Sequence, residues 1–218
     1  MQFSIKTGLT LVGASKFTKL DLKECLKFAP KLVAVDGGAN RLRDLKMVPD
    51  FVIGDMDSID RLDYLSEKHT EIIHISEQNS TDFDKSLRTF IGNNLILAVG
   101  FLGRRNDHLL SCLSTVLRNP TKKIILLNSY DVIFLMPKKF LVSLPVSTRI
   151  SLYPFSAVKG IKSSGLKYPI DDISFSPFGV VGVSNQTINE RVEIEVNSQK
   201  MLIILPRACL RAVLTQIF

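Results

Sequence analysis

Short apolar runs alternate with amphipathic segments through the first half of the chain. The apolar runs have the length expected of buried strands, and they are Leu9–Val12, Leu32–Val35, Phe51–Ile53, Ile72–Ile75 and Leu95–Val99. Several of the segments between them carry apolar residues at spacings of three and four, namely Phe17–Phe28, Ala39–Leu45, Asp82–Ile91 and His108–Leu117. Strands that alternate with helices in this way predict an α/β fold with a mostly parallel sheet.

The pattern changes after Asn119-Pro120. From Lys123 onward, Pro, Gly, Asn and Ser break the apolar runs at intervals of roughly ten residues, which favours an all-β sandwich or barrel. The expected strands are Ile124–Leu127, Val132–Leu135, Phe140–Leu144, Ile150–Tyr153, Val180–Val183, Val192–Val196 and Met201–Leu205. We therefore predict an α/β domain over residues 1–125 and an all-β domain over residues 126–218. The last segment, Arg207–Phe218, fits either a short helix or a final strand.

Composition narrows the class of protein. A chain of 218 residues, 45% of them hydrophobic, can bury a sizeable core. It has no run of about 18 uncharged apolar residues and no secretory signal at its start, so we expect a cytoplasmic protein with no membrane partner. Its three scattered cysteines lack a C-x-x-C spacing and support neither a disulfide framework nor a zinc site.

Charge is distributed unevenly along the chain. The formal net charge is +7, but the basic residues are spread singly and form no patch of the kind that binds nucleic acid, so we expect no nucleic-acid partner. More than half of the acidic residues lie between Asp36 and Asp84. An acidic region within a basic protein suits a metal-bound polyphosphate, because the cation needs carboxylates and the phosphates need positive surroundings.

Polar residues follow four of the predicted strands. Ligands of open α/β sheets bind at the carboxyl ends of the strands, so these residues are the first candidates for a site. They are Asp36-Gly37-Gly38, Gly54-Asp55-Met56-Asp57-Ser58, Gln78 with Thr81-Asp82, and Gly100 with Gly103, Arg104, Arg105, Asp107 and His108.

The first two of these segments supply carboxylates. Asp55 and Asp57 are two residues apart, so both can reach one point, and Mg²⁺ typically takes one or two carboxylates together with substrate phosphate. The alternative is that they cap a turn or the next helix. Asp36 is followed by two glycines, which allow the backbone to approach a ligand closely or simply form a tight turn.

The other two segments open helices. Thr81 is placed to cap a helix whose first turn contains Asp82, and Lys85 lies one turn in, where an ammonium and backbone N–H groups can hold a phosphate. A capped helix with a solvated lysine is the alternative. In the fourth segment, Arg105 offers a guanidinium for phosphate, and Asp107 offers a carboxylate that can accept a hydroxyl proton. A lone histidine such as His108 is more often a helix cap or a satisfied structural residue.

Taken in order, these segments resemble the thiamine pyrophosphokinases. The resemblance rests on Asp36-Gly37-Gly38-Ala39-Asn40, Pro49-Asp50 with Gly54-Asp55-Met56-Asp57-Ser58, Thr81-Asp82-Phe83 with Lys85, Arg105-Asn106-Asp107-His108, Gly165-Leu166-Lys167-Tyr168-Pro169 and Ser184-Asn185. It implies an N-terminal α/β catalytic domain that binds ATP and Mg²⁺, a C-terminal β-sandwich that binds thiamine, and a homodimer whose active sites lie between subunits. The implied reaction moves the diphosphoryl group of ATP to the hydroxyl of thiamine.

The resemblance also implies residue roles. The magnesium carboxylates would be Asp55, Asp57 and Asp82, with Asp36 close by as a further catalytic residue. ATP would meet Gln78, Thr81, Lys85, Arg105, Asp107 and His108, with Asp107 near the reacting hydroxyl, and thiamine would meet Ser184 and Asn185, which by themselves resemble ordinary loop residues.

Two positions depart from the family pattern. Arg104 stands where a second glycine is usual, and Met56 replaces a common phenylalanine. Two other functions are consistent with the same residues: a magnesium-dependent nucleotide phosphohydrolase, in which water replaces thiamine, and a non-catalytic module that binds nucleotide or nucleic acid.

Overall fold

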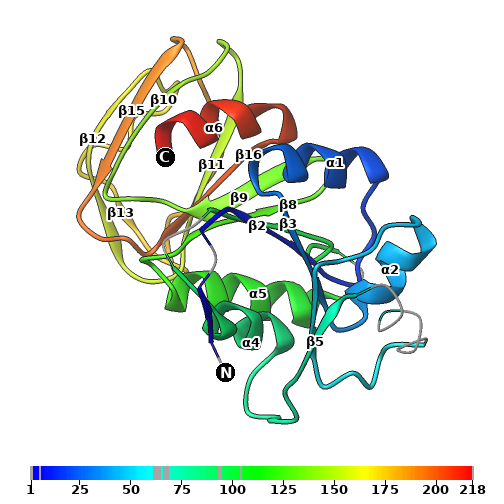
Figure 1. Ribbon diagram of the computed structural model, residues 1–218. Helices are drawn as coiled ribbons and strands as arrows, with labels where there is room; N and C mark the ends of the chain where they lie inside the picture. Colours follow the sequence, from blue (N-terminus) through cyan, green and yellow to red (C-terminus); the bar gives the residue numbers. More distant parts are fainter. Residues whose placement is uncertain are drawn as a thin grey trace. The chain divides into compact units, whose positions relative to one another are not determined.

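The computed structural model describes residues 2–4, 6–60, 65, 69–92, 95–103 and 105–217. The chain forms two compact units, Met1–Ser129 and Tyr130–Phe218. The first unit is an α/β structure and the second is built mainly of antiparallel strands (Figure 1). The predicted fold class is therefore confirmed.

A parallel sheet forms the centre of the first unit. Its strands, in spatial order, are β8 (Lys123–Leu127), β7 (Leu95–Val99), β2 (Leu9–Val12), β3 (Lys31–Val35), β4 (Phe51–Gly54) and β5 (Glu71–His74). Every neighbouring pair runs parallel. In each of the strands β3, β7 and β8, four of the five residues are buried, as expected for strands covered on both faces. The short strands β1 (Phe3–Ser4) and β6 (Phe90–Ile91) form a separate parallel pair.

Helices cover both faces of this sheet. Helices α1 (Lys19–Phe28) and α2 (Gly38–Asp44) lie on one face, and α4 (Asp82–Thr89) and α5 (Asn106–Arg118) lie on the other (Figure 1). The neighbouring strands β2 and β7 therefore send their helices to opposite faces. Such a reversal opens a crevice at the carboxyl ends of the two strands.

Capping residues determine where two of these helices begin. Thr18 and Asp21 form a reciprocal capping box, so α1 starts at Lys19 and not at the first apolar residue, Phe17. The Thr81 side chain accepts a hydrogen bond from the backbone N–H of Asp84, and α4 starts at Asp82. The predicted cap of this helix is confirmed.

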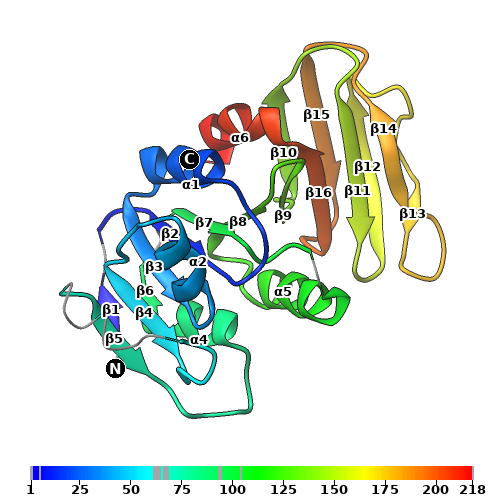
Figure 2. The same cartoon turned by 90° about the vertical axis from the view of Figure 1, so that its right-hand side faces the viewer.

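The second unit contains two antiparallel sheets. One has the order β14 (Gly182–Gln186), β11 (Arg149–Pro154), β16 (Met201–Pro206) and β9 (Asp131–Leu135), and the other has β10 (Lys139–Ser143), β15 (Arg191–Val196), β12 (Val158–Ser164) and β13 (Ser174–Phe175). Figure 2 shows both sheets. The rings of Phe134 in β9 and Phe140 in β10 are 5.5 Å apart between centroids, so the two sheets share a core, as in a sandwich.

The structure differs from the sequence-based expectation in several elements. The segment expected as the first strand of the β-rich half, Ile124–Leu127, belongs to β8, which pairs in parallel with β7. Strand β12 was missed because Gly160 and a register shift interrupt its alternation. The expected strand Val180–Val183 lies two to three residues early, since the paired strand is Gly182–Gln186. The tail forms η1 (Arg207–Cys209) and α6 (Leu210–Ile217), which settles the choice in favour of a helix.

Within the described ranges of residues, none of the helices has both the length and the apolar character that crossing a bilayer requires.

Candidate active site

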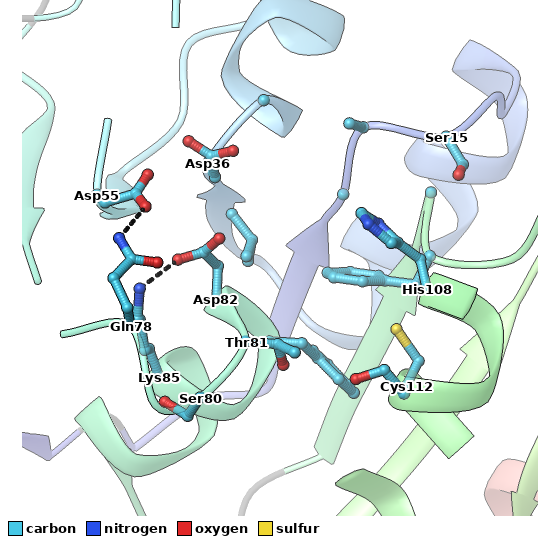
Figure 3. A pocket seen from close by; sticks show the side chains of 18 residues that line it. Ser15, Asp36, Asp55, Gln78, Ser80, Thr81, Asp82, Lys85, His108 and Cys112 are labelled. Carbon is cyan, nitrogen blue, oxygen red and sulfur yellow. Dashed lines mark hydrogen bonds and ion pairs between the residues drawn. The ribbon is translucent and has the colours of Figure 1, made fainter. Parts of the chain in front are cut away.

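A cavity of about 310 Å³ opens in the first unit at the carboxyl ends of its strands. Loops that follow β2, β3, β4, β5 and β7 line it, together with residues of α4 and α5. In Figure 3, Asp36, Asp55 and Asp82 lie toward one end of the cavity, while Ser15, His108 and Cys112 lie toward the other. The crevice predicted by the reversal between β2 and β7 is thus present, and one of its ends is acidic.

Three carboxylates form a tight group at the acidic end. One oxygen each from Asp36, Asp55 and Asp57 lies within 4.8 Å of the other two. Among the described residues, Asp82 is outside this group, and its carboxylate is beside Lys85. The resemblance of the motifs implies Asp55, Asp57 and Asp82 as the metal carboxylates, with Asp36 as a neighbour. The geometry brings Asp36 closer to the other two than that prediction required.

The backbone around these carboxylates is unusual. Asp36 has a φ of 45° and Met56 has a φ of 68°, values that non-glycine residues seldom adopt. A Cβ on Gly54 would lie 2.9 Å from the Cβ of Asp36, so only glycine leaves room for the aspartate. Met56 turns the chain between Asp55 and Asp57. This turn directs both carboxylates to the same place.

The acidic group fits a divalent cation. The Oδ1 atom of Asp36 is buried and has no hydrogen-bond partner within the described part of the chain. A desolvated carboxylate oxygen without a partner is costly, and like charges held this close repel one another. A hard cation such as Mg²⁺ would relieve both costs, since it prefers carboxylate oxygens.

Gln78 orients one of these carboxylates. Its Nε2 donates to Asp55 Oδ2 at 2.9 Å (Figure 3). The pKa of the Asp55 carboxyl is lowered from its ordinary value, and this hydrogen bond is the largest cause. Gln78, expected at the ATP phosphates, therefore holds a proposed metal ligand in its ionised form.

Asp82 and Lys85 form an ion pair in the wall of the cavity. Lys85 Nζ lies 3.0 Å from Asp82 Oδ1, and only 1% of the lysine side chain is exposed, against 28% of the aspartate side chain. Burial, together with the negative charges of Asp36 and Asp55, raises the pKa of Asp82, although Lys85 opposes this. A buried ammonium is costly unless it is paired, so Lys85 is not the solvated surface lysine that the sequence also allowed.

Several residues that line the cavity were not among the predicted site residues. They are Gly13, Ala14 and Ser15 after β2, together with Ser80, Phe83, Phe101, Ser111 and Cys112. The loop after β2 follows the same strand-end rule that identified the other segments, but its small residues carry no distinctive chemistry. Cys112 is an inert part of the wall, because burial raises the pKa of its thiol to about 12.

Two of the predicted phosphate-site residues lie apart from the cavity lining. Arg105 Nη2 is 2.5 Å from Asp107 Oδ2, and both side chains are more than 60% exposed. Arg105 lowers the pKa of Asp107, which makes this carboxylate a weaker base in the present arrangement. Thr81 and His108 do line the cavity. Arg104 lies outside the described residues.

The predicted thiamine residues occupy a hollow of the second unit. Ser184 and Asn185 line it with Ser147, Arg149, Lys167, Tyr168 and Gln186, around a volume of about 240 Å³. The Asn185 side chain accepts from the Tyr168 N–H at 3.1 Å and donates to the Tyr168 carbonyl at 2.7 Å. Asn185 therefore fixes the turn that carries Tyr168, the one aromatic side chain in this lining.

Comparisons with known proteins point to one family for both units. Residues 22–127 match the model of the thiamin pyrophosphokinase catalytic domain, and residues 142–201 match that of the thiamin pyrophosphokinase vitamin B1 binding domain. Thiamine pyrophosphokinase 1 of Oryza sativa subsp. japonica is 31% identical over 212 residues, which cover 79% of this chain and 80% of the relative. Thiamine pyrophosphokinase 1 of Arabidopsis thaliana is 29% identical, with coverage of 76% and 74%.

Solved structures share the fold. Thiamin pyrophosphokinase from Candida albicans superposes with a TM-score of 0.80 at 19% identity, covering 94% of this chain and 93% of that one. The yeast enzyme superposes with a TM-score of 0.79 at 21% identity, with coverage of 94% and 86%.

Proposed function

This chain belongs to the thiamin pyrophosphokinase family, and we propose on that basis that it transfers the diphosphoryl group of ATP to the hydroxyl of thiamine, giving thiamine diphosphate and AMP. In this transfer the hydroxyl oxygen forms a bond to the β-phosphorus of ATP. The bond between that phosphorus and the oxygen it shares with the α-phosphorus breaks, and the hydroxyl proton is released. The observation that carries the proposal is that carboxylate oxygens of Asp36, Asp55 and Asp57 lie within 4.8 Å of one another, beside a cavity that Asp36 and Asp55 line together with the Asp82–Lys85 ion pair.

The triphosphate would lie at the acidic end of the cavity. Asp36, Asp55 and Asp57 would hold Mg²⁺ there, with Asp82 as a further carboxylate close by. When bound, the metal would neutralise charge on the phosphate oxygens, which is the main requirement of phosphoryl transfer. Lys85 would contribute a fixed positive charge from the wall, and the start of α4 would present backbone N–H groups. The proposed contacts of His108, Arg105 and Asp107 with ATP stay predictions.

Thiamine would occupy the hollow of the second unit. Tyr168 offers a ring for stacking, and the sequence contains no tryptophan that could do so. Ser184 supplies a hydroxyl at the rim of the hollow, and Asn185 keeps the turn that carries Tyr168 in place. Stacking on an aromatic face favours a cationic ring such as the thiazolium of thiamine.

We also propose a homodimer in which each active site combines the cavity of one subunit with the hollow of its partner. Apolar side chains on the second unit support an interface, because they are exposed on the single chain; they are Phe178, Val180, Val181, Val183 and Ile188. Cys112 and Cys209 are buried thiols, which agrees with the reducing conditions of a cytoplasmic location.

Subunit complementation tests this arrangement. Asp57→Asn and Asn185→Ala should each inactivate the homodimer, whereas a purified heterodimer of the two should regain roughly half of the wild-type activity, because one of its two sites is intact. Co-expression with two affinity tags supplies the heterodimer. An inactive heterodimer made of folded subunits would place the cavity and the hollow of one site in the same subunit.

The activity is tested by measuring AMP and thiamine diphosphate with ATP and Mg²⁺. AMP should form only when thiamine is present, in a one-to-one ratio with thiamine diphosphate. Nucleotide cleavage that is independent of thiamine would favour the phosphohydrolase. Binding of ATP without any turnover would favour the non-catalytic module.

A further inference from the structure

A series of hydrogen bonds connects the C-terminal end of α5 with the N-terminal end of α4. Arg118, the last residue of α5, places its Nη2 atom 2.7 Å and 2.9 Å from the two carboxylate oxygens of Asp84. The same nitrogen lies 2.9 Å from the hydroxyl of Thr115. Asp84 in turn accepts the hydroxyl proton of Thr81 at 2.8 Å. Neither Asp84 nor Arg118 lines the cavity; both line a neighbouring polar hollow on the far side of Thr81.

Both the oxygen and the proton of the Thr81 hydroxyl form hydrogen bonds with Asp84. Its oxygen accepts from the Asp84 N–H at 3.2 Å, and its single proton goes to the Asp84 carboxylate. A hydroxyl has one proton to donate, so Thr81 has none left for a phosphate. Its contribution to the site is therefore to hold the first turn of α4 in position.

One partner of this ion pair is mostly shielded from solvent, unlike the partners of an ordinary surface ion pair. Only 14% of the Asp84 side chain is exposed, although the guanidinium of Arg118 is partly solvated. The Asp84 carboxylate is thus mostly shielded from solvent and is held from two helices, α4 and α5, which lie side by side (Figure 1).

We propose that Asp84 and Arg118 are positioning residues for diphosphoryl transfer. They hold the start of α4 against α5, so that Asp82 and Lys85 face the triphosphate at a fixed distance from the acidic group. Neither touches substrate. This inference rests on the proposed function, because it assigns the two residues a part in that reaction. Small displacements of groups that contact the reacting atoms cost large factors in rate, so the link should act on kcat.

The test compares Arg118→Ala with a matched ion-pair variant, Lys31→Ala. Lys31 lies 2.7 Å from Asp50 and is likewise partly exposed. It lines neither the cavity nor the neighbouring polar hollow. We expect Arg118→Ala to lower kcat about tenfold, with the KM for thiamine changed less than twofold, while Lys31→Ala keeps the wild-type kcat. Arg118→Lys should recover part of the loss, since an ammonium reaches Asp84 but cannot reproduce the contacts of a planar guanidinium.

A double-mutant cycle provides the second readout. Asp84→Asn and Arg118→Lys keep the size of the side chains, so they report on the link even where an alanine variant fails to fold. The effects of the two changes on log kcat should combine to less than their sum, because each weakens the same link between Asp84 and Arg118. Additive effects, or a wild-type kcat in Arg118→Ala, would overturn the proposal. A raised KM for ATP with unchanged kcat would also overturn it, since it would mean that Arg118 binds the nucleotide directly. Absence of thiamine-dependent AMP from the wild-type protein would instead refute the proposed function.

Discussion

Asp57→Asn is expected to lower kcat by roughly 10²- to 10³-fold, in the range found when one fixed electrostatic contact to a transition state is lost. The amide keeps the size of the side chain but removes one of three negative charges that lie within 4.8 Å of one another. Asp57 is exposed, so the change leaves no cavity in the core. The measurement is kcat as a function of Mg²⁺ concentration, and the half-saturating concentration should rise at least tenfold because a divalent cation needs these carboxylates.

Asp60→Asn is the matched control for this variant. Asp60 lies three residues further along the chain, is also exposed, and pairs with Arg43 at 3.1 Å, so the same chemical change there should leave the Mg²⁺ dependence unaltered. The thermal midpoint of metal-free Asp57→Asn should equal or exceed that of the wild type, because removing one like charge relieves repulsion. A wild-type Mg²⁺ dependence in a folded Asp57→Asn protein would remove Asp57 from the metal site.

Much of the acidic end was predictable because strand ends in a parallel sheet converge. Asp36 follows β3 and Asp55 follows β4, and these strands are neighbours with paired residues up to Val35 and Ile53. The sequence therefore indicated that these strand ends lie together, and the spacing of Asp55 and Asp57 indicated that both carboxylates can reach one point. It did not indicate that Asp36, and not Asp82, completes the group of three, since this depends on the positive φ of Asp36 and Met56, a backbone detail without a sequence pattern.

The role of Lys85 was not decided by the sequence. The helical spacing of Asp82 and Lys85 fits a solvated pair as well as a buried one. What buries Lys85 is the packing of α4 against the sheet, with Phe83 and Phe101 in ring contact at 4.6 Å. Arg105 and Asp107 show the opposite case, because their chemistry suits a phosphate site but the side chains pair with each other in solvent.

The β-rich unit was less predictable than the α/β unit for a physical reason. A buried parallel strand such as β8 has four consecutive buried residues and stands out in the sequence. The antiparallel strand β12 has only two buried positions out of seven, and a register shift after Gly160 breaks its alternation. In β14 the apolar Val183 is exposed while the polar Asn185 is buried. Hydrophobicity there marks a surface and not the core.

Lys85→Met is expected to lower kcat by about 10²-fold and to raise the KM for ATP, since it removes a fixed charge that faces the developing phosphate charge. Methionine has nearly the length of lysine, so the buried position stays filled, and any loss of rate comes from the missing ammonium. Asp82 then loses its partner at 3.0 Å. The measurement is a full kinetic analysis with ATP and thiamine varied separately, and the KM for thiamine should stay within twofold of the wild type.

Lys122→Met, at a half-buried lysine, separates this effect from the general cost of replacing a partly desolvated ammonium. Burial lowers the pKa of Lys122, and its Nζ lies 3.4 Å from the Phe90 carbonyl, away from the residues that line the cavity. Its kinetics should be those of the wild type. The Mg²⁺ dependence distinguishes Lys85→Met from Asp57→Asn: the half-saturating Mg²⁺ concentration should change little in the lysine variant, because Lys85 acts on the phosphates and not on the cation. Unchanged kcat and unchanged KM for ATP in Lys85→Met would mean that its ammonium serves only the fold of α4, and the triphosphate would then have to be bound by the backbone N–H groups and the metal alone.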